Sequence, residues 1–107
     1  MKDIIITIPK TIKWENYMKE LEAAGRGETL NFKVKSFPDT GIGRRCYVVH
    51  NGLIKGYMYI SGMSEKEFDC TTTGKHWAGK FIERTGKFHT IQPIEMKGFR
   101  GFRYKSV

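Results

Sequence analysis

The stretch that decides the fold is Cys46-Tyr47-Val48-Val49-His50-Asn51-Gly52-Leu53-Ile54-Lys55-Gly56-Tyr57-Met58-Tyr59-Ile60. β-Branched and aromatic side chains, which favour strands, fill both ends of it. Between them stands Asn51-Gly52, a pair suited to a type I′ turn because both central residues of that turn need positive φ. The stretch therefore predicts a β-hairpin with strands over residues 46–50 and 53–60.

The segment before the hairpin predicts a strand and then a helix. The apolar run from Ile4 to Ile8 ends at Pro9 and is typical of a short buried strand or an extended entry segment. A helix follows, with Thr11 placed as its N-cap and Gly25 as its end. Its apolar residues recur at roughly helical spacing, so one face should cover a sheet and should place Trp14 and Tyr17 in the core.

From Leu30 the apolar residues alternate with polar ones, which predicts a strand with one wet face carrying Asn31 and Lys33. Residues 61–79 read as a long irregular loop, a feature that is more often functional than idle in a small domain. Further strands are expected over residues 80–84 and 88–96, the latter interrupted by Pro93, with a turn over 85–87. Residues 98–104 predict a short strand or arm.

Five or six short strands and one helix indicate an α+β fold, a small curved sheet or partly closed barrel with a helical cover. The 107 residues make a single domain over residues 1–107, because a second core could not be filled. No apolar run approaches the roughly 18 residues of a membrane span, and the first residues do not form a secretion signal. We therefore expect a cytoplasmic protein that does not associate with membranes.

The net charge of +8 makes a polyanion the first partner to consider, since basic side chains neutralise phosphates and release counterions. Residues 75–107 hold eight Lys and Arg but two Asp and Glu, which places a surplus of +6 there. Cys46 and Cys70 are expected as two thiols rather than a disulfide. The spacing of Cys and His fits no zinc pattern, so we expect neither a metal nor a cofactor.

The hairpin segment from Gly43 to Tyr57, with its Gly-x-Arg start and its apolar-x-Gly second strand, resembles the middle strands of the PUA-like superfamily. Trp77-Ala78-Gly79-Lys80-Phe81-Ile82 and the ending Gly-Phe-Arg-Gly-Phe-Arg-Tyr look like small bacterial or phage members related to ASCH and EVE-type domains. The resemblance covers roughly residues 25–104. It implies a pseudo-barrel of five to six strands with one or two covering helices, which binds RNA or reads modified bases.

Some ASCH members hydrolyse small-molecule amides and carry a G-x-K-x-x-E-x-R-like stretch after the first helix. The comparable stretch here supplies Arg26, Glu28 and Lys33, but it has Asn31 near the place of the expected acid. The resemblance therefore implies, as an alternative to binding, a hydrolase that uses Lys33, Glu28 and Arg26. The departure at Asn31 favours binding over catalysis.

Cationic and flat side chains alternate near the C-terminus. This combination suits nucleic acid, because cations contact phosphates and flat side chains stack on bases. Trp77 has two open interpretations, the wall of a base pocket or a plug of the barrel end. The candidate binding residues are Asn31, Lys33, Lys75, His76, Trp77, Lys80, Arg84, Arg100, Arg103 and Tyr104.

These patterns lead to one main hypothesis, a module that recognises RNA or DNA, modified bases included, through a basic face and an aromatic pocket. Two alternatives stay open. The first is the ASCH-type hydrolase, and the second is a phage or prophage module that docks an acidic protein. The oligomeric state is left open.

Overall fold

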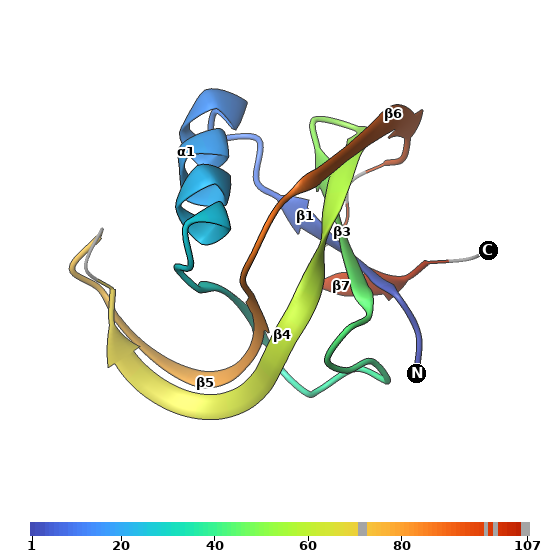
Figure 1. Cartoon of the computed structure of the whole chain (residues 1–107). Helices are drawn as coiled ribbons and strands as arrows, with labels where there is room; N and C mark the ends of the chain where they lie inside the picture. Colours follow the sequence, from blue (N-terminus) through green and yellow to red (C-terminus); the bar gives the residue numbers. More distant parts are fainter. Residues whose placement is uncertain (71–72, 98, 100, 106–107) are drawn as a thin grey trace.

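One curled β-sheet and one helix make up the structure (Figure 1). The structure is a computed structural model that describes residues 1–70, 73–97, 99 and 101–105. Within these residues the elements are β1 (Ile4–Ile8), α1 (Trp14–Gly25), β2 (Leu30–Val34), β3 (Arg45–His50), β4 (Leu53–Asp69), β5 (His76–Arg84), β6 (His89–Glu95) and β7 (Phe102–Tyr104).

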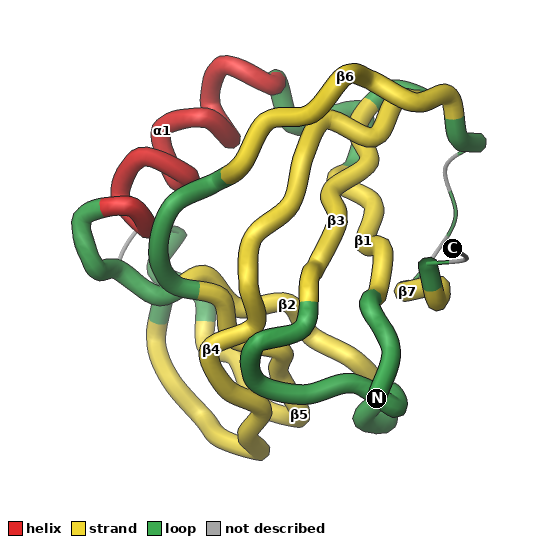
Figure 2. Tube along the Cα trace, turned by 45° about the vertical axis from the view of Figure 1, so that its right-hand side comes forward, coloured by secondary structure: helices red, strands yellow, loops and turns green. Residues whose placement is uncertain are grey.

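Six of these strands follow one another in the order β2-β5-β4-β3-β1-β7 and curl into half a barrel (Figure 2). The remaining strand of the described residues, β6, also pairs with β4. β1 and β3 are parallel, whereas the other pairs are antiparallel. The expected α+β fold with a curved sheet and a covering helix is confirmed at this level.

The hairpin that decides the fold is confirmed. β3 and β4 pair antiparallel, and His50 faces Leu53 across the turn. Asn51 has a φ of 53° and Gly52 a φ of 79°, so both central residues take the positive φ that a type I′ turn requires. The predicted strand over residues 4–8 matches β1, and the predicted strand that begins at Leu30 matches β2.

The helix begins later than its sequence pattern predicts. Lys13, and not Thr11, is the N-cap residue, and its extended backbone leads into α1 without a capping side chain. Residues 9–12 instead form a turn, in which the Ile12 amide donates to the Pro9 carbonyl at 3.0 Å. The buried His50 donates its Nε2–H to the Ile12 carbonyl at 2.7 Å and so holds this turn against β3. Among the described residues, no helix is long and apolar enough to cross a membrane.

The expectation of a long irregular loop over residues 61–79 is wrong. β4 continues to Asp69, and β5 begins at His76, so these residues are mostly a second hairpin. Its turn is closed by the amide of Cys70, which donates to the Lys75 carbonyl at 2.8 Å. The alternation was hidden because polar residues stand on both sides of the ribbon.

The sheet buries side chains on both of its sides. On one side, α1 contributes Tyr17, Leu21 and Ala24 to the main core, which also holds every second residue of β1 and β3. Trp14 packs against this core, as expected. On the other side a smaller cluster contains Ile5, Tyr47, Val49 and Ile54, with Met96 and Phe99 packed against it.

At Lys55, β4 pairs irregularly with both β3 and β6. The register shifts between Val48 and Val49 on β3 and between Ile54 and Gly56 on β4, and residues 91–93 of β6 lie in the same irregular stretch. Pro93 therefore sits where no ladder hydrogen bond is needed. Next to this point, a Cβ on Gly56 would meet the His89 carbonyl oxygen and lie 2.6 Å from the Phe88 ring.

Gly56→Ala should lower the free energy of unfolding by about 1–3 kcal/mol, because the added methyl group has to displace the backbone of β6. Gly25→Ala is the matched control. Its Cβ would meet nothing within 4 Å, and alanine favours the helix by roughly 0.5 kcal/mol or more. Urea unfolding of both variants measures the difference, and equal stabilities would contradict the close packing of β4 and β6.

Candidate functional site

The side of the sheet that faces away from α1 carries a cluster of rings and cations. Strand alternation places Arg45 and Tyr47 of β3 and Tyr57 and Tyr59 of β4 on this side, since Cys46, Val48 and Met58 lie in the main core. His89 of β6 is the cross-strand partner of Tyr57. We call Arg45, Tyr47, Tyr57, Tyr59 and His89 the aromatic face.

Three members of the aromatic face form a stacked column. The Arg45 guanidinium carbon lies 4.3 Å from the centre of the Tyr57 ring. The His89 ring lies 4.9 Å from the same ring at an angle of 16°, which is a stacked arrangement. A guanidinium, a phenol and an imidazole from three strands therefore lie in one stack, and flat groups of other molecules favour the same geometry.

Two more tyrosines surround the column. Tyr59 makes edge contacts with Tyr57 and His89, at ring distances of 5.6 and 5.5 Å. Tyr59 is 41% exposed, whereas Tyr47 is 9% exposed. Tyr47 therefore serves as the floor of the face, and Tyr59 is the ring that solvent reaches most easily.

Hydrogen bonds on the face favour the charged form of Arg45 and the neutral form of Tyr57. The Arg45 Nη1 donates to the Tyr47 hydroxyl at 3.3 Å, and this bond raises the pKa of the exposed guanidinium. A hydrogen bond with Tyr59 raises the pKa of Tyr57 above that of an ordinary tyrosine. The phenol of Tyr57 therefore stays neutral at neutral pH, and it adds no negative charge that would repel an anion.

Further cations border the aromatic face. The Lys105 ammonium lies 5.4 Å from the Tyr47 ring, and the Arg103 guanidinium lies 4.7 Å from the Phe99 ring. Asp3 is the nearby carboxylate before β1, and it is already engaged. Its Oδ1 accepts the Arg45 amide at 2.9 Å and lies 3.2 Å from the Arg44 Nε.

The C-terminal candidate residues divide between the two sides of the sheet. Arg103 pairs with Ile5, which belongs to the cluster beneath the aromatic face, so Arg103 lies on that side. Tyr104 alternates to the other side, and its hydroxyl accepts the Asp39 amide at 2.8 Å. Arg100, the third C-terminal candidate, lies outside the described residues.

Arg84 is not part of the candidate binding surface, because its side chain is buried. It is 3% exposed, and its Nη1 donates to the Tyr17 hydroxyl at 3.0 Å beneath α1. Its Nε is buried without a hydrogen-bond partner among the described residues. Because side chains alternate along β5, the Arg84 side chain points into the main core. A charged residue normally indicates an exposed position, so the sequence did not reveal that Arg84 is buried.

Trp77 does not stand in a loop. It lies in β5 opposite Phe68 of β4 and is half-buried. Lys75 stands in the turn before β5, and the His76 Nδ1 lies 2.9 Å from the Asp69 carboxylate. The indole therefore belongs to a two-stranded ribbon and not to the expected loop.

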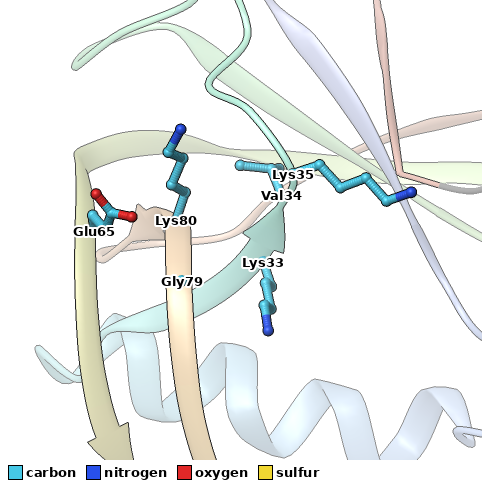
Figure 3. A pocket seen from close by; sticks show the side chains of 6 residues that line it. All are labelled: Lys33, Val34, Lys35, Glu65, Gly79 and Lys80. Atoms are coloured by element: carbon cyan, nitrogen blue, oxygen red, sulfur yellow. The ribbon is translucent and has the colours of Figure 1, made fainter.

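A shallow hollow of about 650 Å³ lies beside β2 and is lined by Lys33, Val34, Lys35, Glu65, Gly79 and Lys80. Its three lysines do not converge (Figure 3). Lys80 and Glu65 point to one side of the strands, Lys33 points to the other, and Lys35 points away along the chain. The ammonium groups therefore do not surround a common anion, and the hollow is not the main candidate site.

The hydrolase alternative finds no shared cleft. Lys33 lines the hollow, but neither Arg26 nor Glu28 is among its lining residues. Arg26 is the C-cap residue of α1, and Glu28 is an exposed residue of the loop that follows. In the described part of the chain, no group of three or more His, Cys, Asp or Glu side chains is placed to hold a metal ion.

Comparison with protein-family models, curated proteins and solved structures finds no match for this chain. The resemblance to PUA-like domains therefore stays a prediction.

Sequence reasoning missed Arg45, Tyr57, Tyr59 and His89. One signal was available, because Arg45-x-Tyr47 and Tyr57-x-Tyr59 lie on the two strands of the predicted hairpin and alternate onto one side. His89 could not be found in this way, since its place beside Tyr57 depends on β6 pairing with β4.

The hydrogen bond between the buried Arg84 and Tyr17 leads to a prediction about stability. Tyr17→Phe removes the hydroxyl that accepts from Arg84, so it should lower the free energy of unfolding by about 1–3 kcal/mol. In an Arg84→Met background no buried charge loses its partner. Tyr17→Phe should therefore lower the free energy of unfolding much less in that background. Urea unfolding of the four proteins gives the coupling, and equal losses in both backgrounds would contradict this role for Tyr17.

Proposed function

We propose that this protein binds single-stranded nucleic acid through the aromatic face. The observation that carries the proposal is the column of Arg45, Tyr57 and His89, with Tyr59 exposed beside it. Bases of a single strand stack on aromatic rings and on guanidinium planes. Each base stacked on an aromatic side chain contributes roughly 1–3 kcal/mol to affinity.

The chemistry around the face suits a strand of phosphates. Arg45 is exposed at the edge of the column, and Lys105 and Arg103 border it with their charges held over rings. Asp3 is occupied by Arg44 and by the Arg45 amide. Phosphates next to stacked bases would therefore meet cations on this face, and binding should weaken as salt rises.

Unpaired bases are the favoured substrate because a duplex keeps the faces of its bases covered by their neighbours. Stacking on rings is tolerant of sequence, so both RNA and DNA single strands fall within the proposal. Tyr59, the outermost ring of this face, is exposed rather than enclosed. The proposal therefore rests on an open stacking surface rather than on selection of a modified base.

A PUA-like relationship is part of the same proposal. Its support is limited to the coarse architecture, a curled sheet with one covering helix. The resemblance of residues 43–57 would assign the hairpin that carries Arg45, Tyr47 and Tyr57 to the middle strands of such a barrel.

The test is a titration of fluorescently labelled single-stranded oligonucleotides of about 12 nucleotides, in RNA and DNA forms, at several salt concentrations. Tyr59→Leu should weaken binding about fivefold or more because a flat ring is lost, whereas Tyr59→Phe should bind nearly as the parent protein does. Arg45→Ala should weaken binding more than Lys19→Ala, an exposed residue of α1 whose loss changes the net charge equally.

Binding that is absent at low salt would overturn the proposal. It would also be overturned if Tyr59→Leu binds like the parent, or if Arg45→Ala and Lys19→Ala have equal effects, since binding would then depend only on net charge. A duplex of the same sequence that binds as tightly as the single strand would exclude base stacking.

A further inference from the structure

Beyond β2, the β4–β5 hairpin continues as a two-stranded ribbon (Figure 1). β2 pairs with β5 only from Lys80 to Arg84, whereas β4 and β5 stay paired as far as Asp69 and His76. The residues of this ribbon, 66–69 and 76–79, therefore have no third strand beside them among the described residues.

The two sides of the ribbon differ in charge. Cross-strand pairing and alternation place Glu65, Glu67 and Asp69 on one side. The side chains of Glu67 and Asp69 are 73% and 81% exposed. The opposite side carries Lys66, Phe68, Trp77 and the bare backbone of Gly79. The acidic side also holds Lys80 and His76, the cross-strand partners of Glu65 and Asp69. Its three carboxylates still make it less favourable to a polyanion than the side that carries Lys66.

Contacts on the second side hold the ribbon to the body of the protein. The Phe68 ring lies 5.1 Å from the ring of Phe81, which is 1% exposed. The Lys66 ammonium lies 2.8 Å from a carboxylate oxygen of Glu83 and 5.3 Å from the Phe68 ring. These contacts fix where the ribbon presents Trp77.

Lys33 reaches the same side from β2. Gly79 has a φ of +137°, and a Cβ there would lie 3.0 Å from the Cε of Lys33, so the lysine chain lies against the glycine. Trp77 is two residues from Gly79 and on the same side of β5. An indole and an ammonium group, the partners of a base and of a phosphate, therefore flank one glycine.

This side of the ribbon continues the side of the sheet that carries the aromatic face. The bulge between Ile60 and Gly62 inserts one residue, and Gly62, Ser64, Lys66 and Phe68 then lie on the side of β4 that carries Tyr57 and Tyr59. β4 thus connects the two surfaces over about 30 Å of strand or less, since Phe68 is nine positions after Tyr59.

We propose that Trp77 and Lys33 form a second contact for the nucleic-acid strand that lies on the aromatic face, Trp77 stacking on a base and Lys33 pairing with a phosphate. This inference rests on the proposed function and extends it, because it makes the binding site longer than the aromatic face.

The test compares single-stranded oligonucleotides of about 4 and about 16 nucleotides, because four stacked nucleotides span about 14 Å, whereas the strand between the two contacts is up to about 30 Å long. Trp77→Ala and Lys33→Ala should each weaken binding of the longer strand about fivefold or more and leave the shorter strand within about twofold. Lys80→Ala is the matched control, since Figure 3 shows Lys80 and Lys33 pointing to opposite sides. It should bind like the parent.

A second readout does not depend on removing a side chain from the ribbon. The chain has two tryptophans, so in a Trp14→Phe background the fluorescence comes from Trp77 alone. The longer strand should quench it, and the shorter strand should not. Loss of affinity in Tyr59→Leu, without loss in Trp77→Ala and Lys33→Ala and without quenching, overturns this inference while the aromatic face stands. No loss in Tyr59→Leu overturns the proposed function itself.

Discussion

The fold depends on the bend of β4 at the bulge between Ile60 and Gly62. β4 is 17 residues long, and it pairs with β3 and β6 before the bulge and with β5 along the rest of its length. The extra residue lets the strand turn while Met58, Ile60 and Met63 stay on the core side. A straight strand could not bring Ile82 of β5 into the same core as Ile4 and Ile6 of β1.

The same constraint leaves one side of the sheet without a helix. α1 fills the hollow of the curl, and the main core takes up its apolar side chains. Among the described residues, the other side has Met96, Phe99 and their neighbours packed against Ile5 and Val49. The rings on that side therefore range from the buried Tyr47 to the exposed Tyr59, so they are supported from beneath while solvent still reaches the outermost ring. This is the physical basis of the aromatic face.

Local signals were enough to predict the elements whose chemistry is local. Asn51-Gly52 predicted its hairpin because positive φ is a property of those two residues, and the Ile4–Ile8 run and the alternation after Leu30 predicted β1 and β2. Glu65-Lys66-Glu67 concealed the second half of β4, because both sides of that ribbon are polar. The burial of Arg84 and the stacking of His89 on Tyr57 depend on pairing between distant strands, which composition does not reveal.

The central claim is that a single strand lies on the aromatic face. The most direct measurement is an NMR titration of the isotope-labelled protein with an unlabelled single-stranded oligonucleotide. The largest shifts are expected in the ring and guanidinium signals of Arg45, Tyr57, Tyr59 and His89, with α1 nearly unchanged. Shifts that are confined to α1, or that spread evenly over exposed lysines and leave these rings unmoved, would contradict it.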